Sequence, residues 1–180
     1  MFDIFFSLLA LIILCPLLIL ISLLIPLFDP GPIIFKQKRV GMDGKLFYMY
    51  KFRSMPINMK NIPSNKVSNL KLNWLCRFIR RTNIDELPQL FNILKSDMSF
   101  VGPRPALPSQ QDLIELRRKS GVLPFKPGLT GLAQISSYDG MNVNTKADFD
   151  KEYINSISLK TDVLIILKTF FYLLKSPPVY

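Results

Sequence analysis

An apolar stretch opens the chain: residues 4–28 read IFFSLLALIILCPLLILISLLIPLF, with no charged side chain among them. A helix needs about 20 such residues to cross the hydrocarbon core of a bilayer, so the stretch predicts a membrane helix. Pro16 follows Cys15 near its middle, and a proline there removes a helical hydrogen bond and predicts a kink. Two forms are open, a kinked helix that spans the bilayer and a re-entrant helix-break-helix that enters and leaves by one face. Hydropathy alone favours the spanning form.

The flanks of this stretch indicate where the rest of the chain lies. No basic segment precedes it and no small-residue cleavage site comes after it, so we do not expect a cleaved signal peptide. Basic residues come soon after it, at Lys36, Lys38 and Arg39. In both forms they place the downstream domain in the cytoplasm. The sequence thus predicts a membrane element over residues 1–30 and a cytoplasmic, membrane-associated domain over residues 31–180.

The composition narrows the chemistry of the domain. The 180 residues include 23 Lys and Arg against 13 Asp and Glu, a net charge of +10, and 49% are hydrophobic. A basic and apolar chain suits anionic lipid better than nucleic acid, which does not require the hydrophobicity. There is no histidine, which excludes Ser-His-Asp triads, Cys-His pairs and the usual zinc hydrolase sites. Carboxylates, Lys, Arg and a hard cation such as Mg²⁺ remain.

Local patterns predict the elements of the domain. Residues 33–37 and 46–52 predict two strands, joined by a hairpin turn at residues 41–44. Helices are predicted over residues 74–79, 85–94, 110–119, 148–154 and 163–174. The last is too short to span a bilayer comfortably, so it is expected to pack in the core or to lie in the membrane interface. Residues 56–73 are expected to form a surface loop and residues 126–134 a glycine-rich loop. The predicted fold class is α+β, mainly α, with a short β-hairpin.

Asp85 and Glu86 are the only two adjacent acidic residues of the chain. A helix tolerates Pro88 only in its first turn, so a helix is predicted to begin at Asp85 or Glu86. There the helix dipole would keep a carboxylate ionised, as a nucleophile toward phosphorus or as a Mg²⁺ ligand. An ordinary capping box of Asn83 and Glu86 explains the same residues, and for the pair taken alone it is the favoured interpretation.

Several cations accompany the acidic pair. Lys51 and Arg53 alternate with apolar residues on a predicted strand, so both are expected on one face. Arg104 stands between two prolines that restrict its backbone. Arg80 lies just upstream of the pair, and Lys126 opens the glycine-rich loop, whose amides could approach a phosphate. Each alone is an ordinary surface residue or turn. Together they predict a site for a diphosphate and a metal at a bilayer surface.

With these residues the chain resembles the small monotopic phosphoglycosyl transferases of the bacterial sugar transferase family. The resemblance covers nearly the whole chain and rests on several motifs in the same order. They are FD (2–3), DPGP (29–32), FKQKRVG (35–41), YKFRSM (50–55), DELPQL (85–90), KSDMS (95–99), VGPRP (101–105) and PGLTG (127–131).

The resemblance implies a mechanism. Asp85 would attack the sugar-linked phosphate of a UDP-sugar, release UMP and carry the phospho-sugar until polyprenyl (undecaprenyl) phosphate takes it, at the start of glycoconjugate assembly. Glu86 would position the acceptor or hold Mg²⁺, for which both carboxylates are the expected ligands. The resemblance and the cation pattern together assign substrate and phosphate binding to Lys51, Arg53, Arg80, Arg104, Lys126, Gly128, Thr130 and Gln134.

The resemblance also implies how the chain meets the membrane. The first helix would be re-entrant and broken at Cys15 and Pro16, which overrides the hydropathy preference. The catalytic domain, residues 31–180, would face the cytoplasm at the bacterial inner membrane. We expect a minimal form without an added N-terminal domain, and the resemblance leaves a homodimer open. Cys15 stands where the family has a serine, and Tyr138 where it often has an arginine, so the sugar is not specified.

Two other functions compete with transfer. A non-catalytic membrane adaptor would bind anionic lipid through its basic face and would tolerate loss of Asp85, Glu86 or Arg104. A membrane-bound hydrolase of nucleotide-sugars or polyprenyl diphosphates would transfer to water and would not require the lipid acceptor.

Overall fold

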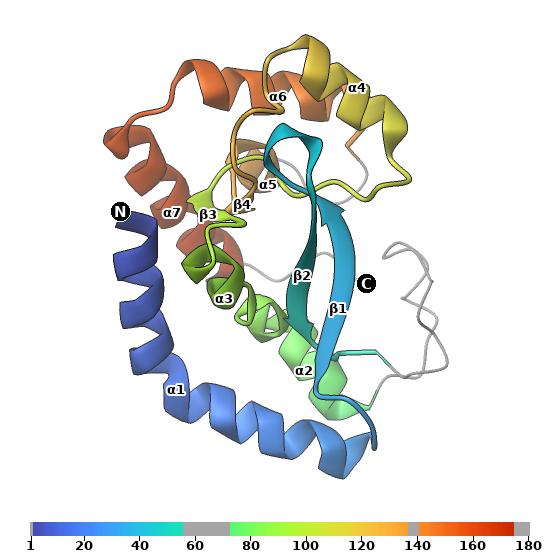
Figure 1. Cartoon of the computed structure of the whole chain (residues 1–180). Coiled ribbons are helices and arrows are strands. Elements are labelled where there is room, and N and C mark those ends of the chain that lie inside the picture. Colours follow the sequence, from blue (N-terminus) through green and yellow to red (C-terminus); the bar gives the residue numbers. More distant parts are fainter. Residues whose placement is uncertain (1, 56–72, 137–140, 175–180) are drawn as a thin grey trace.

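The computed structural model describes residues 2–55, 73–136 and 141–174. This part of the chain is mainly helical and carries two small two-stranded sheets (Figure 1). In chain order its elements are α1 (Phe2–Phe28), β1 (Ile34–Val40), the 3-10 turn η1 (Met42–Gly44), β2 (Leu46–Phe52), α2 (Trp74–Arg81), the 3-10 turn η4 (Ile84–Glu86), α3 (Gln89–Leu94), β3 (Ser99–Val101), α4 (Gln111–Lys119), β4 (Gly128–Thr130), α5 (Leu132–Ser136), α6 (Val143–Asn155) and α7 (Leu159–Leu174).

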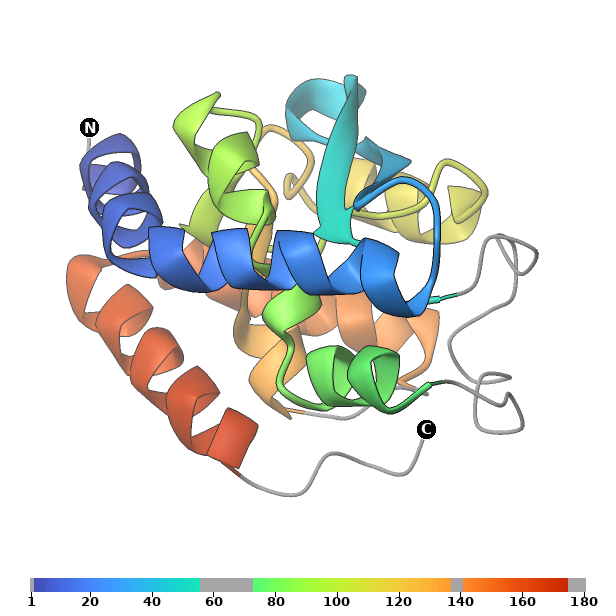
Figure 2. The ribbon, with the colours of Figure 1, turned by 90° about the horizontal axis from the view of Figure 1, so that it is seen from below.

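α1 bends near its middle and wraps around one side of the domain (Figures 1 and 2). Pro16 and Pro26 both lie inside the helix, and the bend agrees with the predicted kink. On the inner side Leu11 packs in one apolar cluster, while Ile21 and Ile25 pack in another. Most of the remaining helix surface is apolar and exposed. Among the described helices, α1 alone is long and apolar enough to cross a membrane by length and composition.

Both ends of α1 are tied to the same domain. Near its start, the Asp3 carboxylate accepts hydrogen bonds from the Ser99 hydroxyl at 3.1 Å and from the Phe100 amide at 3.3 Å. Just after its end, the buried guanidinium of Arg53 donates to the Asp29 carbonyl and forms an ion pair with the Asp29 carboxylate at 3.6 Å. The two ends of the helix are therefore held by one body.

The predicted hairpin is present. β1 and β2 pair antiparallel, with Ile34 opposite Phe52 and Val40 opposite Leu46. The Asn92 side chain of α3 accepts from the Tyr50 amide at 3.0 Å and donates to the Tyr48 carbonyl at 2.7 Å. This side chain takes the place of a neighbouring strand at the free edge of β2, and it fixes α3 against the hairpin.

The glycine-rich loop predicted over residues 126–134 is instead a strand followed by a helix. β4 pairs parallel with β3, and α5 comes directly after it. Gly128 allows this pairing because a Cβ on it would stand 2.1 Å from the amide nitrogen of Gly102. The Gly128 amide donates to the Pro103 carbonyl at 3.0 Å, so it is not turned toward a ligand. The prediction was wrong because this three-residue strand carries no periodic pattern of its own and pairs only through the distant Gly102.

The outer helices extend further than their sequence periodicity indicated. α6 begins at Val143 because the Asn142 side chain accepts from the Thr145 amide at 2.8 Å, a regular helix cap. α7 buries Ile165 but leaves other apolar side chains exposed, among them Leu159, Phe170 and Phe171. Of the two expectations for this helix, the exposure favours an interface over the core. Residues 56–72 of the predicted surface loop lie outside the described residues.

Candidate active site

Glu86 is the centre of a partly buried charge cluster. Its Oε1 accepts from the Lys51 ammonium of β2 at 2.6 Å and from the Arg104 guanidinium at 2.8 Å. A second Arg104 nitrogen lies 3.5 Å from Oε2. The Glu86 side chain is only 16% exposed. Burial raises the pKa of this carboxyl, but the charges of Arg104 and Lys51 outweigh it and hold the pKa well below its usual range. Glu86 is therefore a fixed anion at neutral pH.

Asp85 lies beside this cluster but has a different environment from Glu86. Its closest hydrogen-bond donor among the described residues is the Ser54 hydroxyl, 3.4 Å from Oδ2. Burial, together with the neighbouring Glu86 carboxylate, raises the pKa of Asp85 to about 6 against the opposing charges of Lys51, Arg80 and Arg104. The sequence predicted a carboxylate kept ionised by a helix dipole. The shift has the opposite sign, because burial outweighs the local cations.

The local backbone explains why Asp85 sits at no helix end. Asn83 adopts a left-handed conformation with φ 52° and its side chain makes no capping hydrogen bond. A single 3-10 turn comes next over Ile84–Glu86, and α3 begins only at Gln89, after Pro88. The predicted capping box and helix start were therefore both wrong. The tight turn leaves both carboxylates on a short connection between α2 and α3, where they face β2 and the loop that carries Arg104.

The backbone around Arg104 is fixed on one side by four consecutive carbonyl groups, each of which accepts a hydrogen bond. The donors are the Gly128 amide for Pro103 at 3.0 Å, an Arg117 guanidinium nitrogen for Arg104 at 3.0 Å, an Arg39 guanidinium nitrogen for Pro105 at 2.9 Å and the Val40 amide for Ala106 at 2.9 Å. Four different donors on β4, α4 and β1 thus hold this loop. The loop can present the Arg104 side chain to Glu86 with little freedom lost on binding.

Arg117 is itself held by a buried carboxylate. Two of its nitrogens donate to the same oxygen of Asp150 on α6, at 2.9 and 2.6 Å, and both side chains are buried. Sequence reasoning singled out neither Arg117 nor Asp150, nor Arg39 as a site residue. No local pattern marks them, since the residues they join lie 33 and 66 positions apart along the chain.

Of the other predicted site residues, one lies near Asp85 and the rest make their contacts elsewhere. Arg80 of α2 contributes positive charge at Asp85. Arg53, predicted on one face with Lys51, is instead turned to Asp29 and Pro30 at the end of α1. The Thr130 hydroxyl bonds the Thr169 hydroxyl of α7 at 2.6 Å. The Gln134 amide lies 3.4 Å from the Leu129 carbonyl, and the Lys126 carbonyl lies close to Gly102. Tyr138 lies outside the described residues.

The donor set suits a particular kind of metal ion. The described residues contain no group of three or more His, Cys, Asp or Glu side chains able to hold a metal. Mg²⁺ is commonly held by one or two carboxylates and takes its remaining ligands from substrate phosphates and water. Asp85, which meets a hydroxyl only at 3.4 Å, and the remaining lone pairs of Glu86 fit such an ion. They fit it only when a phosphate substrate completes the ligand set.

A carboxylate pair held among fixed cations is suited to phosphate chemistry, and the same domain carries an apolar helix long enough to cross a membrane. The chain belongs to the bacterial sugar transferase family, whose model matches residues 1–176. It is 38% identical over 99% of its length to an undecaprenyl-phosphate galactose phosphotransferase of Salmonella typhimurium. It is 39% identical over 94% of its length to a UDP-glucose:undecaprenyl-phosphate glucose-1-phosphate transferase of Escherichia coli. An N-acetylgalactosaminephosphotransferase of Aeromonas hydrophila, acting on undecaprenyl phosphate by its name, is 36% identical over 93% of the chain. The chain spans 41%, 38% and 41% of these relatives' lengths.

Proposed function

We propose that this chain moves a sugar-1-phosphate from a UDP-sugar to undecaprenyl phosphate and releases UMP, as the first membrane step of glycoconjugate synthesis. Its family and the names of its relatives support the reaction class. The observation that carries the mechanism is the contrast within the acidic pair. Glu86 is saturated by two cations, whereas Asp85, with a raised pKa, has the Ser54 hydroxyl at 3.4 Å as its closest donor among the described residues.

Asp85 is the nucleophile in this proposal. One of its carboxylate oxygens forms a bond to the sugar-linked phosphorus, and the bond from that phosphorus to the bridging oxygen breaks. The electron pair leaves with the bridging oxygen on UMP. An oxygen of undecaprenyl phosphate then attacks the same phosphorus and returns Asp85 to a free carboxylate. A carboxylate with a raised pKa is a better nucleophile than one stabilised by several donors, because less stabilisation is lost when its charge is consumed.

The neighbouring residues bind and orient. Lys51 and Arg104 converge on one oxygen of Glu86, which fixes two positive charges beside Asp85 before substrate arrives. Preorganised charges of this kind stabilise the phosphoryl oxygens as the transfer proceeds. Asp85 and Glu86 would also hold Mg²⁺ together with the substrate diphosphate, and the ion would supply further neutralisation of that charge.

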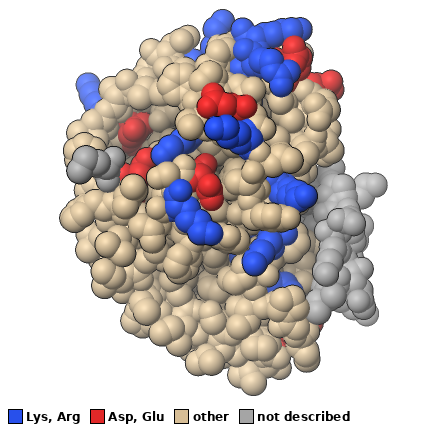
Figure 3. Space-filling model, viewed as in Figure 1, with Lys and Arg blue, Asp and Glu red and all other residues tan. Residues whose placement is uncertain are grey.

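The arrangement of α1 supports a re-entrant membrane element, with the catalytic domain on the cytoplasmic face of the inner membrane. A straight helix of this length would reach about 40 Å and end on opposite faces of a bilayer. Here the helix bends, and Asp3 and Asp29 at its two ends both bind the same domain (Figure 1). On the face of the molecule seen in Figure 3, charged side chains cover the middle and upper part, and few lie along the edge that α1 forms. A lipid-borne acceptor would approach from that edge.

Intact-protein mass spectrometry tests the mechanism. The wild-type chain is incubated with Mg²⁺ and a panel of UDP-sugars, without undecaprenyl phosphate. We expect one added phospho-sugar and one released UMP per chain. Asp85→Asn should show neither, and Asp148→Asn, an exposed carboxylate of α6, should behave as wild type.

Three other outcomes would count against the proposal. UMP that continues to accumulate without acceptor would indicate the hydrolase. An adduct that persists in Asp85→Asn would move the nucleophile elsewhere. A folded protein that forms no adduct and releases no UMP with the UDP-sugars would favour the adaptor.

A further inference from the structure

Four cations, Arg104 among them, gather around the loop that carries Arg104. Arg117 and Arg39 donate to the adjacent carbonyls of residues 104 and 105, at 3.0 and 2.9 Å, so three guanidinium-bearing residues meet on one loop. The fourth cation is Lys146 of α6. Lys146 lies one helical turn before Asp150, the partner of Arg117, so the two side chains share one face of α6.

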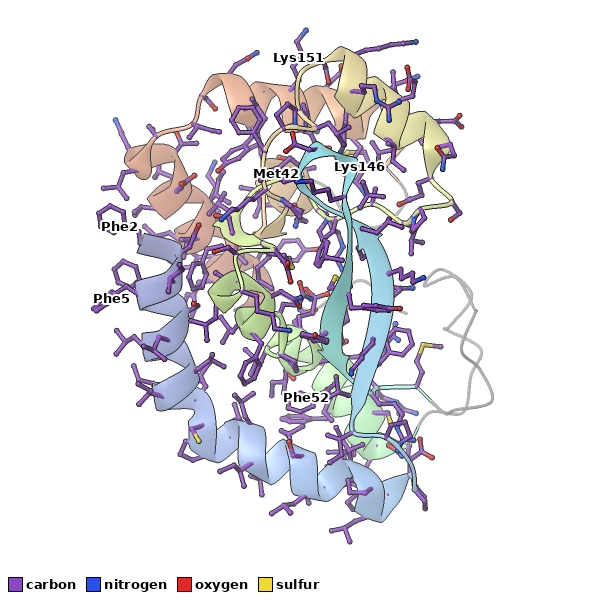
Figure 4. The ribbon with its side chains drawn as sticks, in the orientation of Figure 1. Phe2, Phe5, Met42, Phe52, Lys146 and Lys151 are labelled. Carbon is purple, nitrogen blue, oxygen red and sulfur yellow. The ribbon has the colours of Figure 1, made fainter. Side chains whose placement is uncertain are left out.

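The packing of α6 sets Lys146 over this loop. Ala147, the next residue, is buried in an apolar cluster with Val40 of β1 and with Ala106, which belongs to the loop that carries Arg104. In Figure 4 Lys146 lies near the tip of the β1–β2 hairpin, on the inner side of α6. Lys151 of the same helix points outward. The Lys146 ammonium therefore faces the loop that carries Arg104.

Within the described part of the chain, the two carboxylates that contact this cluster, Asp150 and Glu86, already have cationic partners. Asp150 bonds Arg117, and Glu86 bonds Lys51 and Arg104. Among the described residues, neither Arg39 nor Lys146 forms an ion pair. The Arg39 guanidinium donates to neutral groups, the Gln37 side-chain oxygen at 3.1 and 2.6 Å and the Pro105 carbonyl at 2.9 Å, and half-buried Lys146 makes no hydrogen bond. Burial lowers the pKa of Lys146, and the charges of Arg117, Arg104 and Arg39 lower it further, against Asp150 alone. Partly buried cations without an anion are costly, and they are typical of sites that receive one.

We propose that Lys146, with Arg39 and Arg104, forms a subsite for the nucleotide-side phosphate of the donor. This inference rests on the proposed function and adds to it the residues that receive the leaving group. When the bond to the sugar-linked phosphorus breaks, the electron pair and a full negative charge pass to the phosphate of UMP. Cations placed where that charge develops stabilise the transition state.

The position of the cluster favours the nucleotide over the lipid acceptor. Arg39 lies opposite Phe47, four residues along β2 from Lys51, about 13 Å toward the tip of the hairpin. That end of the hairpin lies beside α4 and α6, away from the second half of α1 (Figure 1). A lipid-borne phosphate would reach Asp85 and Glu86 from the apolar edge that α1 forms, whereas a water-soluble nucleotide can enter from this polar side.

The test compares UMP with uridine, which lacks the phosphate. Binding of each to the purified full chain is measured by calorimetry for wild type, Lys146→Met, Lys146→Arg and Lys151→Met. We expect Lys146→Met to bind UMP roughly tenfold to a hundredfold more weakly, as loss of a charge-assisted contact predicts, with uridine binding unchanged. Lys146→Arg should retain most of the UMP affinity. Lys151→Met removes the same charge from the exposed face of α6 and should bind UMP as wild type does.

Several results would overturn the inference. UMP affinity that is unchanged in Lys146→Met would exclude the subsite, and an equal loss in Lys151→Met would assign the effect to overall charge. A variant that keeps its UMP affinity but has a raised KM for undecaprenyl phosphate would assign the site to the acceptor. If wild type forms the phospho-sugar adduct and Lys146→Met binds UMP as wild type does, the subsite alone is refuted. If wild type forms no adduct, the proposed function itself is refuted.

Discussion

Replacement of Glu86 by glutamine should move the acid limb of the reaction to lower pH. With a pKa of about 6, only about one in ten Asp85 side chains is ionised at pH 5, so kcat/KM should fall about tenfold per pH unit below 6. Glutamine removes the negative charge that raises this pKa and releases Lys51 and Arg104 from Glu86. Both changes favour ionised Asp85. We expect the midpoint to fall by about one pH unit, worth about 1.4 kcal/mol.

The assay is initial UMP release between pH 4.5 and 8 at saturating Mg²⁺, and its readout is the midpoint of the acid limb rather than the height of the profile. Loss of a Mg²⁺ ligand would lower the height and raise the midpoint, because it weakens the hold on a cation beside Asp85, so a fall of the midpoint reports the lost negative charge of Glu86 itself. Glu115→Gln, which removes an exposed carboxylate of α4, is the matched control and should keep the wild-type midpoint. A midpoint that stays at 6 in Glu86→Gln, or rises, would refute this account of how Asp85 is tuned.

Three further predictions concern the scaffold, and each is checked on purified protein in detergent or on isolated membranes. Asp150→Asn should destabilise the fold by about 3 kcal/mol or more in chemical denaturation, because it leaves the Arg117 guanidinium buried without its anion. Replacement of both residues by apolar ones should recover much of that loss. Gly128→Ala should lower the melting temperature strongly, since its Cβ would meet the Gly102 amide nitrogen at 2.1 Å, and a melting temperature equal to wild type would contradict the close approach. Phe171→Lys, on the exposed face of α7, should leave the melting temperature unchanged and reduce recovery in the membrane fraction.

The sequence predicted those features that depend on neighbouring residues. The apolar run, its central bend and the hairpin around residues 41–44 are all determined by local pattern. Strand β4 was missed because its pairing with β3 depends on a contact between two glycines 26 residues apart, Gly102 and Gly128. Arg53 was assigned to the site from strand alternation and the family resemblance, yet a distant carboxylate, Asp29, determines where its guanidinium lies. Long side chains are placed by partners that the local pattern does not contain.

The two acidic residues of the candidate site also differ because of distant partners. In the sequence, Asp85 and Glu86 share one predicted helix start, one dipole and one set of neighbouring arginines, and no local pattern separates their pKa values. In the fold, the hairpin brings Lys51 and the proline-flanked loop brings Arg104 to Glu86, while Asp85 receives burial with one weak donor. Their pKa values are driven in opposite directions, one well below and one above the usual range. Neighbouring carboxyls separated in this way can divide the work, with one as a permanent anchor for cations and the other as the group that reacts.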